Sequence, residues 1–200
     1  MYSQTFTVAA ASLTGHASNV TGAIWVIATP GAADLLGHHV TIRNDSATDH
    51  SAKTIILVGT GANDEPLTET LAAPGVSATV TSLKAFKTLT SATPSATIGA
   101  DTFDIGWAAT AHSPWVSTIA SAHEFSVSVA VIVGGTINYD VQHVYGALTE
   151  DNTAFNHSIL NNKTVTDDGQ YVSPVNGVRV DVNSHTSGVF ILTVLQGGST

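Results

Sequence analysis

The segment EFSVSVAVIVGGTINYDVQHVY, residues 124–145, decides the fold. Its apolar side chains recur at every second position on both sides of the Gly134-Gly135 pair. Because successive side chains of a strand point to opposite faces, this alternation is typical of a half-buried β-strand. A Gly-Gly pair between two such runs predicts a hairpin turn. One face is expected to carry Phe125, Val127, Val129, Val131 and Val133 before the turn, and Ile137, Tyr139, Val141, His143 and Tyr145 after it.

The same period of two recurs along most of the chain. TFDIGW places Phe103, Ile105 and Trp107 on one face, and GVRVDVN repeats the pattern with valines. Helical turns are expected only within residues 30–37 and 149–160. We therefore predict an all-β protein with an antiparallel β-sandwich or jelly-roll-like architecture. Further strands are expected in QTFTVAA, GAIWVIAT, HVTIRN, KTIILVG, LTETL, SATVTS, KAFKTLT and GVFILTVLQ.

A domain boundary is expected near TAHSPW, residues 110–115. This stretch follows a completed strand, contains Pro114 and precedes a segment in which the strand pattern starts again. A length of 200 residues allows one large domain or two small ones. We predict two tandem β-sandwich modules, an N-terminal one over residues 1–112 and a C-terminal one over residues 113–200.

The chain is poor in charge and rich in hydroxyl groups. Only 10% of its residues are charged and its formal net charge is −9, whereas it has 28 Thr and 19 Ser. A typical soluble domain has about 25% charged residues. Hydroxyl groups make a surface polar without making it ionic, so close contact with other chains requires the desolvation of few charges.

The composition argues against nucleic-acid and membrane partners. The six basic residues are scattered, so no phosphate-tracking stripe and no nucleic-acid binding are expected. The chain has no Cys. It also has no visible signal peptide and no apolar run near the roughly 20 residues of a membrane span, so we predict no membrane contact. The Asn-x-Ser/Thr triplets at Asn19, Asn44, Asn156 and Asn162 are interpreted as unglycosylated.

Two acidic stretches are candidates for a metal or acid–base site. GTGANDEPLTETL, residues 59–71, contains Asp64, Glu65 and Glu69, but Asn, Asp and Pro between two apolar runs predict a hairpin tip. Glu69 is expected in mid-strand on the polar face. TVTDDGQY, residues 164–171, predicts a turn at its Asp-Gly pair. Neither stretch has the ligand spacing of a calcium loop, and the first lacks the third Gly of a dinucleotide loop.

The remaining candidate residues do not form a catalytic or metal pattern. His38 and His39 are adjacent and would point to opposite faces of a strand, so they are unsuited to bind one ion. The other histidines are isolated and are interpreted as surface or interface residues, with convergence on a trimer axis left open. Trp25 and Trp107 are predicted in the core, and Trp115 is either core or part of a binding surface. The sequence contains no nucleophile elbow (G-x-S-x-G), whereas a pair of carboxylates for glycoside hydrolysis, brought together by the fold, stays an open alternative. We predict no enzyme activity, no catalytic residue, no metal and no cofactor, and the partner-binding residues stay unknown.

Three segments resemble a pattern found in structural proteins of tailed-bacteriophage virions. They are Thr68-Glu69-Thr70-Leu71, residues 86–91 (FKTLTS) and Ile105-Gly106-Trp107, and NYDVQHVY with the terminal VLQ extends the likeness. Around Glu65-Pro66 the chain departs from the usual Gly of the first loop.

The resemblance implies a non-enzymatic virion subunit, assembled in the host cytoplasm. Within that class, the expected function is a capsid decoration or cement protein, a homotrimer that binds the major capsid protein. The alternative is a head–tail (neck) or tail-fibre component that contacts neck or tail proteins and carries a glycan-binding face.

Overall fold

A computed structural model describes residues 1–119 and 126–196. Within these ranges the chain forms strands and no helix, which confirms the all-β prediction. One antiparallel sheet follows the path β11-β10-β13-β8-β3-β6 with β1, β2, β9 and β12 attached, and a second has the order β5-β4-β7. The strands are β1 (Tyr2–Thr7), β2 (Ser12–Val20), β3 (Gly37–Asn44), β4 (Thr54–Thr60), β5 (Pro66–Ala72), β6 (Thr79–Phe86), β7 (Thr88–Pro94), β8 (Phe103–His112), β9 (Val116–Ser117), β10 (Val127–Val144), β11 (Phe155–Asn156), β12 (Asp167–Tyr171) and β13 (Gly177–Gln196).

The chain forms two compact units. The middle unit comprises Ala11–Ala33 and Gly37–Ala108, and the terminal unit comprises Met1–Ala10, Asp34–Leu36 and Ala109–Thr200. The division at Ala108 lies close to the boundary predicted at residue 112. Residues 1–10 group with the C-terminal residues because β1 pairs with β13. That two tandem modules over residues 1–112 and 113–200 fold as separate domains stays a prediction.

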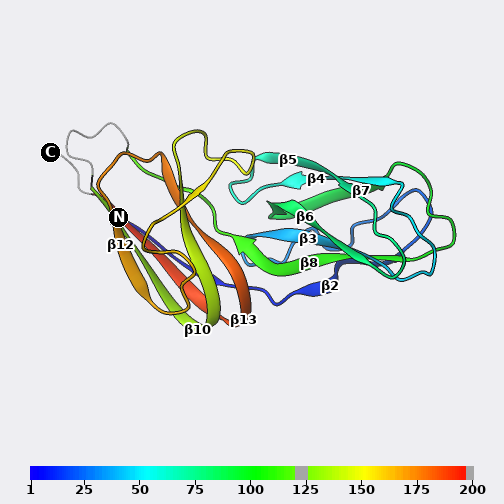
Figure 1. Cartoon of the computed structure of the whole chain (residues 1–200), viewed down its shortest axis with the longest axis horizontal. Coiled ribbons are helices and arrows are strands. Elements are labelled where there is room, and N and C mark those ends of the chain that lie inside the picture. The colour runs from blue at the N-terminus through cyan, green and yellow to red at the C-terminus, as the bar shows by residue number, and fades with distance from the viewer. Residues whose placement is uncertain (120–125, 197–200) are drawn as a thin grey trace. The chain divides into compact units, whose positions relative to one another are not determined.

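The middle unit is a β-sandwich. Its three-stranded sheet β5-β4-β7 forms one layer, and β2, β8, β3 and β6 form the other (Figure 1). Both layers direct alternate apolar side chains into one core, as the period of two in the sequence requires. The buried residues include Val40 and Ile42 of β3, Ile55 and Leu57 of β4, Leu67 and Leu71 of β5, and Phe103 and Ile105 of β8.

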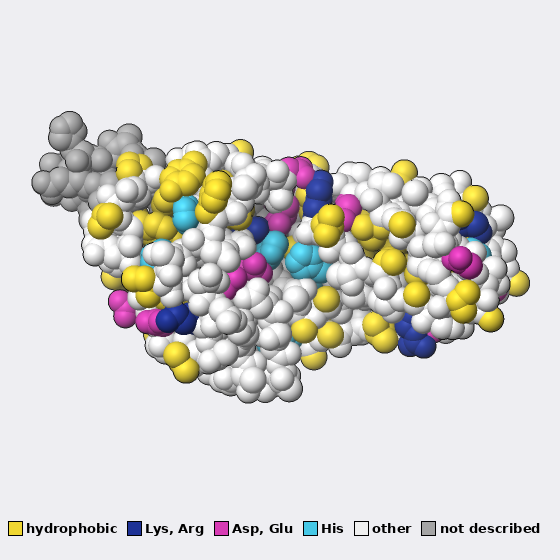
Figure 2. All heavy atoms as spheres, in the orientation of Figure 1, with side chains coloured by type: hydrophobic (Ala, Val, Ile, Leu, Met, Phe, Trp, Pro, Cys, Tyr) yellow, Lys and Arg dark blue, Asp and Glu magenta, His cyan; other side chains and the backbone are white. Residues whose placement is uncertain are grey.

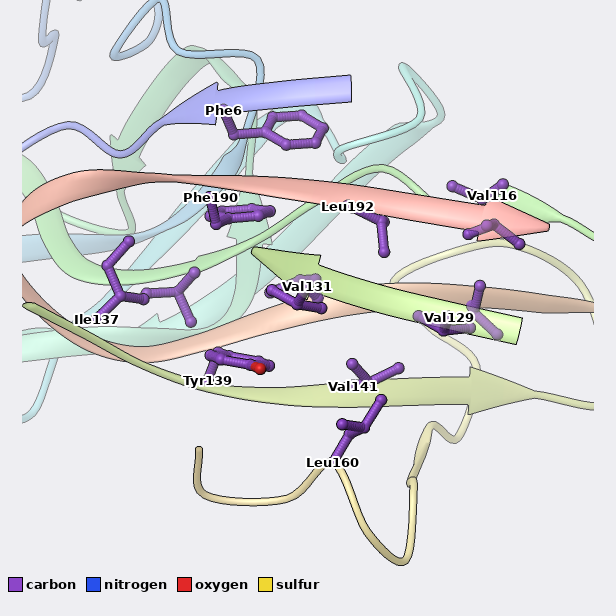
Figure 3. Packing of buried hydrophobic residues seen from close by; sticks show 14 of the residues in the cluster. Phe6, Val116, Val129, Val131, Ile137, Tyr139, Val141, Leu160, Phe190 and Leu192 are labelled. Atoms are coloured by element: carbon purple, nitrogen blue, oxygen red, sulfur yellow. The ribbon is translucent and has the colours of Figure 1, made fainter. Parts of the chain in front are cut away.

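The terminal unit is built around a long ribbon of β10 and β13. These strands pair antiparallel from Val127↔Gln196 to Val144↔Gly177. They run side by side along a curved path in Figure 1. The alternate residues of β10 that were predicted to share a face do face one core, from Val127 to Val141. In the same core Phe6 of β1 stacks on Phe190 of β13, with 4.9 Å between ring centroids (Figure 3). Phe125 lies outside the described residues.

The hairpin predicted at Gly134-Gly135 is wrong. β10 continues through the pair, and its partner on both sides is β13, with Gly135 opposite Gly188. Both Gly135 and Gly188 have positive φ, and a Cβ on Gly188 would lie 2.3 Å from the carbonyl oxygen of Gly134. The glycines therefore allow two backbones to approach closely where the ribbon bends. A Gly-Gly pair indicates unusual backbone angles, and a bent strand requires these as much as a turn does.

The turn predicted at Asp167-Asp168-Gly169 is also wrong. These residues belong to β12, where Gly169 pairs with Val129 of β10. A Cβ on Gly169 would lie 2.8 Å from Cε1 of His157, so this glycine makes room for a neighbouring side chain. Close approach, and not a chain reversal, explains its place in the sequence.

Three other local predictions differ from the structure. Residues 22–29 (GAIWVIAT) form no strand, although Trp25 and Ile27 pack against the core and Ile24 and Val26 are exposed. Residues 33–36 form bends and Gly37 begins β3, and residues 149–160 contain the short strand β11 and no helix.

Candidate functional site

A pocket of about 250 Å³ opens in the terminal unit beside β11 and the C-terminal ends of β10 and β12. Three separate segments of the chain supply its walls, so no single sequence motif predicts the pocket. The lining residues are His143, Tyr145, Asn156, His157, Ser158, Gln170, Tyr171, Val172, Ser173 and Val175.

Aromatic rings surround one histidine at this pocket. The centroid of the His143 ring lies 5.2 Å from those of Tyr145 and Tyr171, and 5.8 Å from that of Phe155. The Tyr145 and Phe155 rings are 5.7 Å apart. Both remain strongly exposed, at 57% and 47%, although aromatic side chains gain most when they are covered. Tyr145 of the lining and the neighbouring Phe155, which does not line the pocket itself, therefore form an aromatic surface open to solvent.

The deeper wall is ordered by hydrogen bonds. Nδ1 of His157 accepts the backbone N–H groups of Ile159 at 3.1 Å and Leu160 at 3.2 Å. The ring proton therefore sits on Nε2, which lies 3.4 Å from the carbonyl oxygen of Gln170. This pairing fixes the orientation of the imidazole against Tyr171, whose ring meets it edge-on with centroids 4.5 Å apart.

The pocket lining has no acidic or basic side chain apart from its two histidines, since it contains no Asp, Glu, Lys or Arg. Burial, followed by the nearby His157, lowers the pKa of His143 and so favours the neutral imidazole. Burial, followed by the nearby Tyr145, raises the pKa of the Tyr171 phenol, which keeps its proton. The pocket can therefore offer hydrogen bonds and aromatic faces but no ion pair.

A second cluster in the terminal unit is charged and buried. Nη1 of Arg179 lies 2.6 Å from Oε1 of Glu150, and Oε2 of Glu150 lies 2.8 Å from Nδ1 of His112. Nε2 of His112 is 3.4 Å from Asp181, and Gln142 bridges Arg179 and Asp181. Burial raises the pKa of Asp181, which His112 and Arg179 partly offset. The Arg179 guanidinium also stacks 4.4 Å from the centre of the Trp115 ring.

This buried cluster is suited to holding strands together. Its carboxylates and guanidinium bind one another, and the nearby hydroxyl of Ser113 is fully buried and accepts the backbone N–H of Val180 at 2.9 Å. Among these residues, no solvent-accessible nucleophile lies beside His112. Trp115, whose role the sequence left open, is therefore a buried partner of Arg179.

The middle unit offers a flat face without charges. On the outer side of the β5-β4-β7 sheet, Ile56 lies between Thr70 and Thr93, and Val58 lies between Thr68 and Ser91. Ile56 and Val58 are 42% and 38% exposed. Figure 2 shows the same tendency on the face of the molecule that it displays, where uncharged side chains and backbone greatly outnumber acidic and basic groups.

The acidic stretch of residues 59–71 forms the predicted hairpin. β4 and β5 pair from Thr54↔Ala72 to Thr60↔Pro66, and Asp64 occupies the turn with a φ of 64°. Its carboxylate pairs with Nζ of Lys87 at 2.7 Å.

The placement predicted for Glu69 on the polar face is wrong. Glu69 is two residues from both Leu67 and Leu71, so the period of two places it on their side of β5. There its carboxylate accepts the backbone N–H groups of Leu83 at 2.8 Å and Lys84 at 2.9 Å, from β6. Glu69 thus connects the two layers of the middle unit.

The histidines and tryptophans singled out in the sequence occupy separate places. Nδ1 of His38 lies 3.1 Å from the carbonyl oxygen of Ala108, and Nδ1 of His39 lies 2.9 Å from that of Ser82, so the two rings have different partners. Trp25 is buried as predicted and packs on Phe103, whereas Trp107 is half-buried beside His16. His123 and Glu124 lie outside the described residues.

The described residues hold no group of three or more His, Cys, Asp or Glu side chains arranged to bind a metal ion. Over residues 1–119 and 126–196 there is also no helix long and apolar enough to cross a membrane.

No family model and no curated protein matches the chain. A solved structure described as "Structure of infectious bursal disease virus Gx strain" is 13% identical, with 98% of this chain and 71% of that chain covered and a TM-score of 0.21.

Proposed function

We propose that the protein is a non-enzymatic structural component of a phage virion, of the decoration or cement type. In this role it binds the outer capsid shell and clamps neighbouring capsid subunits together. The resemblance of residues 68–71, 86–91 and 105–107 to phage structural proteins supports the class. The charge-free outer face of the β5-β4-β7 sheet is the observation that supports a cement role.

The chemistry of this face suits contact with another protein. Ile56 and Val58 supply apolar area at its centre, and the Thr and Ser side chains around them can exchange hydrogen bonds with water for hydrogen bonds with a partner. No ion has to be desolvated when the face is covered, so docking avoids the large free-energy cost of burying an unpaired charge.

The size of the face implies that one copy binds weakly. Three strands of seven residues cover about 14 Å by 23 Å, or roughly 330 Å². A standard stable interface buries about 800 Å² on each partner. A protein with this face therefore gains firm attachment by engaging several capsid subunits at once, because linked contacts act at high effective concentration. Binding only to the assembled lattice then stabilises that lattice at every site.

The proposal is tested with particles that lack the protein. We expect such particles to assemble but to break at a lower temperature, and added protein should restore their heat stability in moderately high salt, because few ion pairs are screened. A variant with Ile56→Lys and Val58→Lys should fail to rebind, whereas the control Val165→Lys, at an exposed site of the terminal unit, should rebind normally.

A different outcome would move the protein to another part of the virion. Particles that keep full heat stability without the protein, yet do not adsorb to cells or do not join tails, would contradict the cement role. They would support the neck or tail-fibre alternative. The number of copies per virion separates the same two possibilities, since a shell protein repeats over the whole lattice.

A further inference from the structure

We propose that the aromatic pocket of the terminal unit binds a neutral saccharide through a single pyranose ring. This inference goes beyond the cement role and does not depend on where in the virion the chain sits. The size of the pocket is the first argument. Pockets for drug-sized ligands begin at about 300 Å³, so a pocket of about 250 Å³ suits one small ring better than a nucleotide or a lipid chain.

The exposed rings at the rim are the second argument. Tyr145 and Phe155 stand beside the pocket with about half of their surface in water. An aromatic ring has an electron-rich face, and the C–H groups of a pyranose present the weakly positive, apolar surface that packs against it. A ligand of this kind covers both rings and recovers the hydrophobic free energy that their exposure leaves unused.

The absence of charge is the third argument, and it decides the class of sugar. A phosphate or a carboxylate needs a basic partner, and a cation needs a carboxylate, yet the pocket lining has neither. Phosphorylated and acidic sugars are therefore excluded. A ligand that is neutral and rich in hydroxyl groups matches a wall of amides, hydroxyls and imidazoles.

Two amide side chains are held in place to receive such hydroxyl groups. Nδ2 of Asn156 donates to Asp140 at 3.1 Å, and Nε2 of Gln170 donates to Ser126 at 2.7 Å. Each amide is thus fixed through its nitrogen, and its oxygen has no partner among the described residues. These two oxygens can accept hydrogen bonds from sugar hydroxyls, while Ser158 and Ser173 in the lining can donate or accept.

Saturation-transfer NMR on the purified full chain tests the proposal. The probes are D-glucose, D-galactose, D-mannose and N-acetyl-D-glucosamine, each at millimolar concentration because one ring offers few contacts. We expect transfer to the ring protons of at least one of them. Tyr145→Ala and Phe155→Ala should each weaken its binding by about three- to tenfold. Tyr145→Phe, which keeps the ring, should bind nearly as the natural chain does.

The controls separate a site from a general loss of structure. Val165→Ala removes apolar surface from an exposed position outside the lining and should leave binding unchanged. Circular dichroism should show the natural spectrum for every variant. No transfer from any of the four sugars, equal transfer in the Tyr145→Ala/Phe155→Ala double variant, or stronger binding of glucose 6-phosphate would each overturn the proposal. Particle heat stability is measured separately, so failure here leaves the cement role standing.

Discussion

At the scale of single residues, we expect disruption of the buried Arg179–Glu150 ion pair to cause the largest loss of stability. Both side chains are at most 5% exposed, and they lie 2.6 Å apart. Removing Glu150 leaves the buried guanidinium without its carboxylate partner, although Gln142 and Trp115 still contact it, and breaking a buried pair of this kind costs about 3–5 kcal/mol. We predict that Glu150→Ala lowers the free energy of unfolding by that amount in chemical denaturation. The Lys163–Asp167 pair, whose side chains are 29% and 30% exposed, is the control nearer to solvent, and Lys163→Ala should cost less than about 1 kcal/mol. Equal costs for the two substitutions would contradict this prediction.

A second prediction at this scale concerns pH. Burial lowers the pKa of His16 and of His143 below the ordinary value of 6.5. The unfolded chain therefore binds more protons than the folded chain just below pH 6.5, so the free energy of unfolding falls as the pH drops through that region. The stabilisation from these neutral histidines is fully present above pH 6.5.

Thermal unfolding of the natural chain and of His16→Asn at pH 7.5 and 5.5 checks this effect. The variant should lose a smaller part of its stability over the same interval. Asp181, whose raised pKa acts in the opposite direction, is common to both proteins and cancels in the comparison. If the variant and the natural chain lose the same amount of stability between pH 7.5 and 5.5, His16 does not contribute to the effect.

At the scale of elements, the bend of the β10–β13 ribbon depends on two particular glycines. Gly188 has a φ of 139°, and a Cβ there would lie 2.3 Å from the oxygen of Gly134. Strained backbone of this kind costs about 1–3 kcal/mol for a residue with a side chain, and the clash adds to it. We predict that Gly188→Ala lowers the free energy of unfolding by at least about 2 kcal/mol.

Gly134 provides the control within the same bend. A Cβ on Gly134 would meet its nearest atom, Cγ2 of Val189, at 3.4 Å, and Gly134 has no positive φ. Gly134→Ala should therefore change stability by less than about 1 kcal/mol. Denaturation curves for the two variants give the comparison, and similar curves would show that close backbone approach does not set the bend.

The same elements show which features of the fold sequence patterns can predict and which they cannot. Period-two alternation located β4, β5, β8, β10 and β13 because it reports which side chains face a core, and that property is local. It could not tell which strand pairs with which. Gly134-Gly135 and Asp168-Gly169 satisfy the requirements of a turn equally well, but their partners lie far away in the sequence. The choice between a turn and a continuous strand is made by those distant segments.

At the scale of the whole molecule, the candidate site was beyond the reach of motif analysis. The pocket gathers residues near positions 143, 157 and 171 from three separate segments, and each residue type has an ordinary role where it stands in the sequence. The buried cluster of Glu150, Arg179 and Asp181 was missed for the same reason. A shortage of charged residues was the available signal, because any charge that such a chain retains has to be paired or solvated.

The last prediction is the state of association of the whole molecule. One copy of the β5-β4-β7 face is too small for a stable contact, whereas a closed homotrimer presents three copies and matches the local three-fold points of an icosahedral shell. We expect light scattering of the purified protein at micromolar concentration to give three times the chain mass of 20.5 kDa. Because hydroxyl and backbone contacts are little screened, the mass should persist when the salt concentration is raised. A mass of 20.5 kDa under these conditions would contradict a preformed trimer, and binding to the shell would then have to bring the copies together.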